Sequence, residues 1–160
     1  MKKLFIYYSL SGNGDVVAKK FESLGFDIRR VESKLKLSKH LLPCMLKGGF
    51  LAGIGSKPKL INYDNNVNDY DEIYIGAPIW NSCLACPINT VLKETNLDNK
   101  NVTFVLYSGS GEAKKAIKKL NKNYPNAKII KLKQPKGNLE ELEKLGEKIW
   151  EEQRLSNYMN

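Results

Sequence analysis

The sequence predicts an α/β fold: a three-layer sandwich in which a parallel sheet of five strands lies between two layers of helices. Apolar runs of strand length alternate with amphipathic segments, and glycine- or serine-rich loops follow three of these runs. The chain has 160 residues, which suits a single domain over residues 1–160. This alternation in so short a chain matches the strand order 2-1-3-4-5.

The expected strands are short apolar runs, several of them rich in β-branched or aromatic residues. They cover residues 3–8, 26–31, 72–75, 101–107 and 127–132. The expected helices cover residues 15–24, 87–95, 113–123 and 139–155. In the last helix, the predicted inward face consists of Leu139, Leu142, Leu145, Ile149 and Trp150. Residues 32–70 show no strong period, so we expect a long connection with no more than one short helix, and residues 77–86 are expected to form a loop.

The composition, 42% apolar and 27% charged, is typical of a soluble globular protein. No apolar run approaches the roughly 20 residues that a membrane span needs. We interpret residues 4–10 as part of a buried strand rather than a signal peptide, because the run is short and ends in a serine–glycine turn. We therefore expect a cytoplasmic protein. The odd count of three cysteines argues against a disulfide framework.

The net charge of +9 is distributed unevenly along the chain. Residues 139–155 carry six glutamates, whereas residues 33–59 and 113–136 contain lysines and no acidic residue. One interpretation is an acidic partner, such as an acidic redox protein, a membrane surface or nucleic acid. The other is a set of solvated lysine faces. Nucleic acid is disfavoured, because no aromatic residues are interleaved with the lysines as in a single-strand binder.

The loop after the first strand leads directly into a helix, whose N-terminus offers unpaired N–H groups and a partial positive charge. Its residues are Ser9, Leu10, Ser11, Gly12, Asn13 and Gly14. The glycines allow close approach to an anion, and the hydroxyls and the amide add donors. Because the loop contains no Lys or Arg, it suits a phosphate monoester held by neutral donors.

Two other phosphate-binding patterns can be compared with the same loop. A nucleoside-triphosphate loop ends in Gly-Lys-Ser/Thr, and Gly14-Asp15-Val16 does not match it. A dinucleotide fingerprint needs a third small residue, where this chain has Val17. The dinucleotide alternative stays open, because Glu32 lies where a ribose-binding acid is expected.

Three segments, in this order along the chain, resemble the flavodoxin family. Residues 8–14, Tyr-Ser-Leu-Ser-Gly-Asn-Gly, resemble its phosphate signature Ser/Thr-x-Ser/Thr-Gly-Asn-Thr, with Gly14 in place of the final threonine. Residues 76–81, Gly-Ala-Pro-Ile-Trp-Asn, resemble the Gly-x-Pro-Ile-Trp segment of the branch related to quinone reductases. Residues 107–111 resemble the third flavin loop. The similarity spans nearly the whole chain, and residues 33–65 match least.

The resemblance implies a flavodoxin-like domain that binds FMN, with the phosphate in the loop at residues 9–14. The isoalloxazine ring would lie between the loops after the third and fourth strands, where Trp80 could stack on it or cover its edge. The residues expected to frame the ring are Pro78, Ile79, Trp80, Asn81, Ser108, Gly109 and Ser110. The resemblance also implies a redox function, in which the bound FMN exchanges electrons with a redox partner protein or is reduced by an NAD(P)H-linked donor. Carrier flavodoxins are typically acidic, and the charge of +9 departs from that.

Two other functions remain as alternatives. Cys83 and Cys86 form a CxxC at a helix start, the spacing of a redox dithiol, although small structural residues are the simpler interpretation. A metal site is disfavoured because a second Cys/His pair is lacking. The other alternative is a flavodoxin-like interaction module without cofactor. His40, the only histidine, lies in the unpatterned connection and is expected to cap or pack rather than to catalyse.

Overall fold

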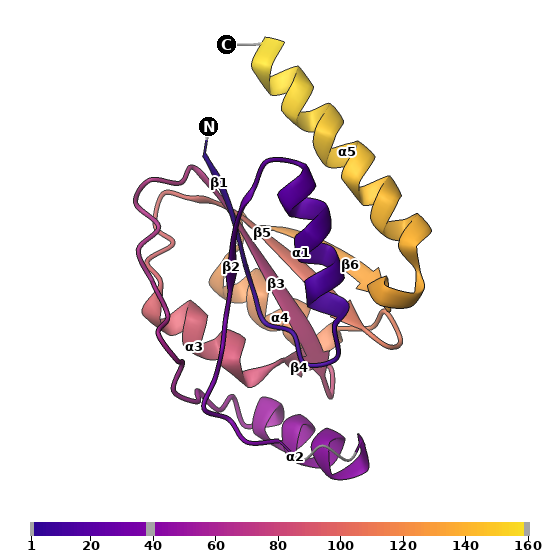
Figure 1. Ribbon diagram of the computed structural model, residues 1–160. Coiled ribbons are helices and arrows are strands. Elements are labelled where there is room, and N and C mark those ends of the chain that lie inside the picture. The colour runs from indigo at the N-terminus through magenta and orange to yellow at the C-terminus, as the bar shows by residue number, and fades with distance from the viewer. Residues whose placement is uncertain (1, 38–40, 159–160) are drawn as a thin grey trace.

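A parallel sheet forms the centre of the protein, as the computed structural model in Figure 1 shows. The structure describes residues 2–37 and 41–158, so His40 lies outside the described residues. From one edge to the other, the strands are β2 (Asp27–Arg30), β1 (Lys3–Tyr7), β3 (Glu72–Trp80), β5 (Asn101–Ser108) and β6 (Lys128–Lys133). Neighbouring strands in this series are parallel. The predicted order 2-1-3-4-5 is therefore confirmed.

Helices cover both faces of the sheet and complete the predicted three layers (Figure 1). One face carries α1 (Asn13–Ser23) and α5 (Leu139–Tyr158), and the other carries α3 (Cys86–Glu94) and α4 (Lys114–Asn123). Successive strand residues point to opposite faces. Phe5 accordingly joins the core against α1 and α5, and Ile6 joins the core against α3 and α4.

The predicted end of the third strand and the predicted loop at residues 77–86 are wrong. β3 continues to Trp80, and β4 (Cys83–Leu84) folds back against it as an antiparallel strand. Asn81 and Ser82 connect them with φ values of 49° and 63°. Two consecutive left-handed residues are typical of a two-residue hairpin turn. Glycine and proline in residues 76–78 suggested an interruption, but the strand continues through both.

The long connection contains a helix of 13 residues, α2 (Leu41–Gly53), which is longer than the short helix expected there. It lies beyond the carboxyl ends of the strands, next to the hairpin of β3 and β4 (Figure 1). Gly48 allows this approach: a Cβ atom built on it would lie 3.3 Å from the Trp80 ring. The connection therefore adds a wall to the end of the sheet where the glycine- and serine-rich loops lie.

The predicted inward face of α5 is correct for three residues and wrong for two. Leu142, Leu145 and Ile149 are buried, whereas Leu139 and Trp150 are 57% and 52% exposed. Residues three or four apart share a helix face, but Trp150 follows Ile149 directly and is therefore turned about 100° away. Its ring instead lies beneath the Arg154 guanidinium, 5.2 Å from the ring centroid.

Gly76 is the position where the central strands pack most tightly. A Cβ atom there would lie 2.5 Å from Phe5 Cζ and 2.9 Å from Tyr7 Cβ. We expect Gly76→Ala to lower the free energy of unfolding by about 1–3 kcal/mol, as overpacking of a core does. Urea unfolding followed by circular dichroism measures the change.

Gly137→Ala is the matched control, because nothing lies within 4 Å of a Cβ atom at that position. Its stability should equal or slightly exceed that of the wild type. Equal stability of Gly76→Ala and Gly137→Ala would contradict the packing described for the central strands.

Candidate functional site

A cleft of about 780 Å³ opens at the carboxyl ends of β1, β3 and β5. The predicted site residues that line it are Ser9, Leu10, Ser11, Asn13, Gly14, Pro78, Ile79, Trp80, Asn81, Ser108 and Gly109. Gly12 and Ser110 belong to the same loops but do not line the cleft. The fold thus brings three separate predicted segments to one place, as adjacency of parallel strands requires.

Sequence reasoning missed several residues of the cleft. They are Leu46, Gly48, Gly49 and Phe50 of α2, together with Tyr107 and Gln134. The apolar patch around residues 41–50 was visible in the sequence, but nothing in its pattern related it to this end of the sheet. Leu46 and Phe50 remain 67% and 66% exposed, so α2 adds apolar surface to the rim.

The loop at residues 9–14 brings unpaired backbone donors to the cleft. Gly12 has a φ of 91°, a left-handed conformation that favours glycine, and α1 begins at the next residue. The N–H groups of a helix's first turn have no partner within the helix. The loop therefore leads into the N-terminus of α1 at the edge of the cleft.

The Ser9 hydroxyl donates its hydrogen bond to a carboxylate. It donates to Asp15 at 2.9 Å, and the Tyr7 hydroxyl donates to the same side chain at 3.0 Å. Burial raises the pKa of Asp15, but these hydrogen bonds and the Arg30 guanidinium outweigh burial and lower its pKa below the usual value. Burial, reinforced by the hydrogen bond to Asp15, raises the pKa of Tyr7 to about 12. Ser9 thus positions Asp15 in this arrangement rather than offering its proton to the cleft.

Tyr107 explains why position 14 is glycine. Its hydroxyl donates to the Tyr8 carbonyl oxygen, and a Cβ atom on Gly14 would lie 2.5 Å from that hydroxyl. The same Cβ atom would lie 2.9 Å from the Tyr8 carbonyl oxygen. Burial keeps the Tyr107 hydroxyl protonated by raising its pKa well above the usual value. The space that a side chain at position 14 would need is already filled.

Asn13 ties two loops together. Its side-chain oxygen accepts a hydrogen bond from the backbone N–H of Lys136 at 3.0 Å, and its amide nitrogen donates to the Ser11 hydroxyl at 3.3 Å. A serine hydroxyl that accepts a hydrogen bond still has its own proton to give. Ser11 is therefore the side-chain hydroxyl of this loop whose proton is available to a ligand.

The opposite wall of the cleft is held by contacts within and between its loops. Trp80 meets Tyr8 edge to face, with ring centroids 5.9 Å apart, and Gly48 lies against its ring. The Ser108 hydroxyl accepts a hydrogen bond from the Gly111 N–H at 2.8 Å. Gln134 donates to the Gly109 carbonyl oxygen at 3.0 Å. These contacts fix the positions of the β3–β4 hairpin and of the loop after β5, which both line the cleft.

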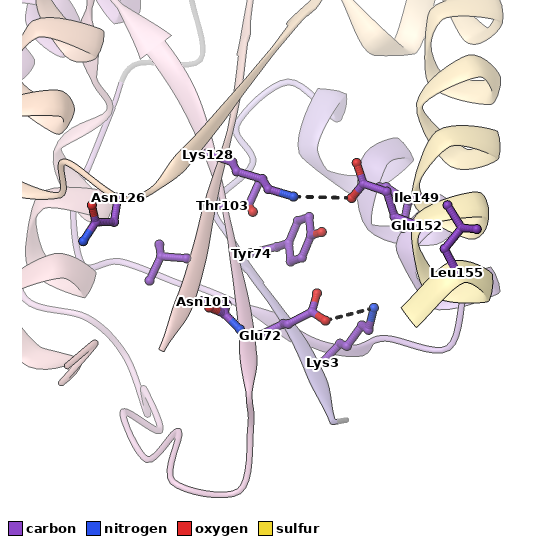
Figure 2. A pocket seen from close by; sticks show the side chains of 11 residues that line it. Lys3, Glu72, Tyr74, Asn101, Thr103, Asn126, Lys128, Ile149, Glu152 and Leu155 are labelled. Atoms are coloured by element: carbon purple, nitrogen blue, oxygen red, sulfur yellow. Dashed lines mark ion pairs between the residues drawn. The ribbon is translucent and has the colours of Figure 1, made fainter. Parts of the chain in front are cut away.

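A second cavity, of about 560 Å³, lies at the other end of the sheet, beneath α5 (Figure 2). Its four charged side chains form two ion pairs with one another. Lys3 pairs with Glu72 at 3.2 Å, and Lys128 pairs with Glu152 at 3.6 Å, with the Tyr74 ring between the two pairs (Figure 2). Ligands of such folds bind at the carboxyl ends of the strands, so we assign this cavity no ligand.

Among the side chains that the structure describes, which do not include those of residues 38–45, no three metal-ligating groups gather into a set that could hold a metal ion. Within residues 2–37 and 41–158, no helix is long and apolar enough to cross a membrane.

Several solved structures are similar to this chain. A candidate flavoprotein from Bacteroides eggerthii DSM 20697 is 23% identical, with a TM-score of 0.69 over 83% of this chain and 88% of that chain. A flavoprotein from Lactobacillus acidophilus NCFM, solved in complex with FMN, is 25% identical, with a TM-score of 0.63 over 81% of this chain and 89% of that chain. Oxidised flavodoxin 1 from Bacillus cereus is 14% identical, with a TM-score of 0.51 over 91% of this chain and 95% of that chain. The likenesses to the Bacteroides and Bacillus proteins concern the fold alone.

None of the curated proteins matches the sequence significantly. The family model described as flavodoxin, in contrast, matches residues 2–150, which is nearly the whole chain. Both the sheet order and the loops around the cleft agree with that match. This chain belongs to the flavodoxin family.

Proposed function

We propose that residues 1–160 form a single domain that binds FMN and serves in electron transfer, as a carrier or as a small reductase. The observation that carries the proposal is the convergence of three loops on one cleft at the carboxyl ends of adjacent parallel strands. The FMN bound by the similar Lactobacillus flavoprotein supports the choice of cofactor.

The chemistry of the cleft fits FMN at both ends. One end offers the N–H groups of the first turn of α1 and the Ser11 hydroxyl, which suit a phosphate. The other end offers apolar and aromatic surface from Trp80 and Phe50, which suits a flat ring. The proposed binding residues are Ser9, Leu10, Ser11, Gly12, Asn13, Gly14, Pro78, Ile79, Trp80, Asn81, Ser108, Gly109 and Ser110.

Bound FMN would supply reversible one- or two-electron chemistry. The chain's part is to bind and orient it. Loop N–H groups would hydrogen-bond the ring edge, and α2 would shield one side of the cleft. Electrons would come from a redox partner protein or an NAD(P)H-linked donor, and the charge of +9 favours an acidic partner surface.

The dithiol alternative gains no support from the cysteines. Cys86 is buried, and that burial raises the pKa of its thiol to about 11, although a backbone hydrogen bond lowers it slightly. A reactive dithiol needs the opposite, an accessible thiolate near neutral pH. We also propose a cytoplasmic location, which the odd count of three cysteines favours. Immunoblotting of cell fractions would test that location.

Addition of FMN to the purified apoprotein should quench flavin fluorescence in a saturable manner, because the ring enters an aromatic cleft. Ser11→Glu should weaken FMN binding by tenfold or more, since about 1.4 kcal/mol of repulsion between like charges suffices. Ser23→Glu, the same change at the far end of α1, should bind like the wild type. Unquenched flavin fluorescence with the wild type would contradict the proposal.

Gly14→Ala should destabilise the protein by about 1–3 kcal/mol, because its Cβ atom would overlap the Tyr107 hydroxyl. In the Tyr107→Phe background the same substitution should cost less, since that hydroxyl is gone. A double-mutant cycle of unfolding free energies measures the coupling. Additive effects would show that the two side chains do not compete for the same space.

Native protein treated with iodoacetamide at pH 8 should carry no label on Cys86, because the thiol is buried and protonated. Peptide mass spectrometry locates the label, and urea-unfolded protein labelled at Cys86 provides the control. Rapid labelling of native Cys86 would restore the dithiol alternative.

A further inference from the structure

Lys136 lies beside the loop at residues 9–14, although it is far from this loop in sequence. It belongs to a short 3₁₀ helix, η1 (Pro135–Gly137), which follows β6 and contacts α1. Its ammonium nitrogen lies 3.5 Å from where a Cβ atom of Gly12 would be. Its backbone N–H is fixed by the hydrogen bond to Asn13. Neither Gly12 nor Lys136 lines the cleft, so the side chain starts from an anchored backbone beside the loop rather than inside the cleft.

Among the described residues, the charges around this loop pair with one another and not with Lys136. Arg30 is balanced by Asp15 at 3.1 Å and by Glu32 at 3.6 Å. Lys136 makes no ion pair with any residue in the described part of the chain. The loop thus faces one uncompensated positive charge, which its own sequence, free of Lys and Arg, does not contain.

From this placement we infer that the Lys136 ammonium pairs with the phosphate of bound FMN and makes the protein discriminate FMN from riboflavin. The inference rests on the proposed function. A phosphate monoester carries about −1.5 to −2 charges at pH 7, so the exposed ammonium of Lys136 beside neutral donors adds a Coulomb attraction that riboflavin lacks. Lys136 acts on the phosphate alone and does not touch the ring.

The test compares FMN and riboflavin titrations of wild type, Lys136→Gln, Lys136→Arg and Lys122→Gln, followed by flavin fluorescence at low salt. In Lys136→Gln the Kd for FMN should rise about fivefold, the upper effect of an exposed charge pair, while the Kd for riboflavin stays unchanged. Lys136→Arg should retain FMN affinity. Lys122→Gln, which removes the same charge at the far end of α4, should match the wild type.

Salt provides a second readout, because the attraction is electrostatic. At about 0.5 M salt the difference between wild type and Lys136→Gln should largely disappear. Equal FMN affinities at low salt, or an equal loss for FMN and riboflavin, would overturn the role of Lys136 and leave the proposed function intact. Failure of the folded wild type to bind FMN would overturn both.

Discussion

The pairing of β3 between β1 and β5 is the constraint on which the candidate site depends. Tyr7 stands opposite Gly76, and Gly76 stands opposite Val105, so the three strands run in register to the same edge. Phe5 fills the space over Gly76, where no side chain could fit. With this register fixed, the loops that follow the three strands must emerge side by side. The cleft is thus a consequence of strand order and one tightly packed glycine.

Contacts between the loops then shape what the cleft can hold. Tyr107, at the end of β5, donates a hydrogen bond from its hydroxyl to the Tyr8 carbonyl oxygen, just after β1. The same hydroxyl occupies the space beside Gly14. The Ser9 hydroxyl donates a hydrogen bond to the Asp15 carboxylate, which also contacts Tyr7 and Arg30. The Asp15 carboxylate is therefore not a free negative charge beside the cleft. A phosphate in this loop would therefore depend on backbone N–H groups, Ser11 and the nearby lysine of η1.

The sequence was sufficient for the order of the sheet, because alternating strand and helix patterns leave few topologies. It was also sufficient to select three loops that meet in space. It could not predict the hairpin at Asn81 and Ser82, because left-handed φ values at these residues depend on β4 pairing with β3. The full length of α2 could not be predicted for a related reason. Gly48 and Gly49 weaken a helical pattern in the sequence, yet they permit the helix to approach Trp80 and Asn81. Tertiary contacts, rather than local propensity, determine both the hairpin and α2.

The central claim is that FMN binds at the carboxyl ends of β1, β3 and β5. Amide chemical shifts of the isotopically labelled protein, recorded with and without FMN, test it most directly. The account predicts that the largest changes fall in residues 9–14 and 108–111 and in the β3–β4 hairpin. Amides at the starts of the strands, near Lys3 and Glu72 in Figure 2, should change little. Changes centred on that second cavity, or no changes at all, would contradict the account.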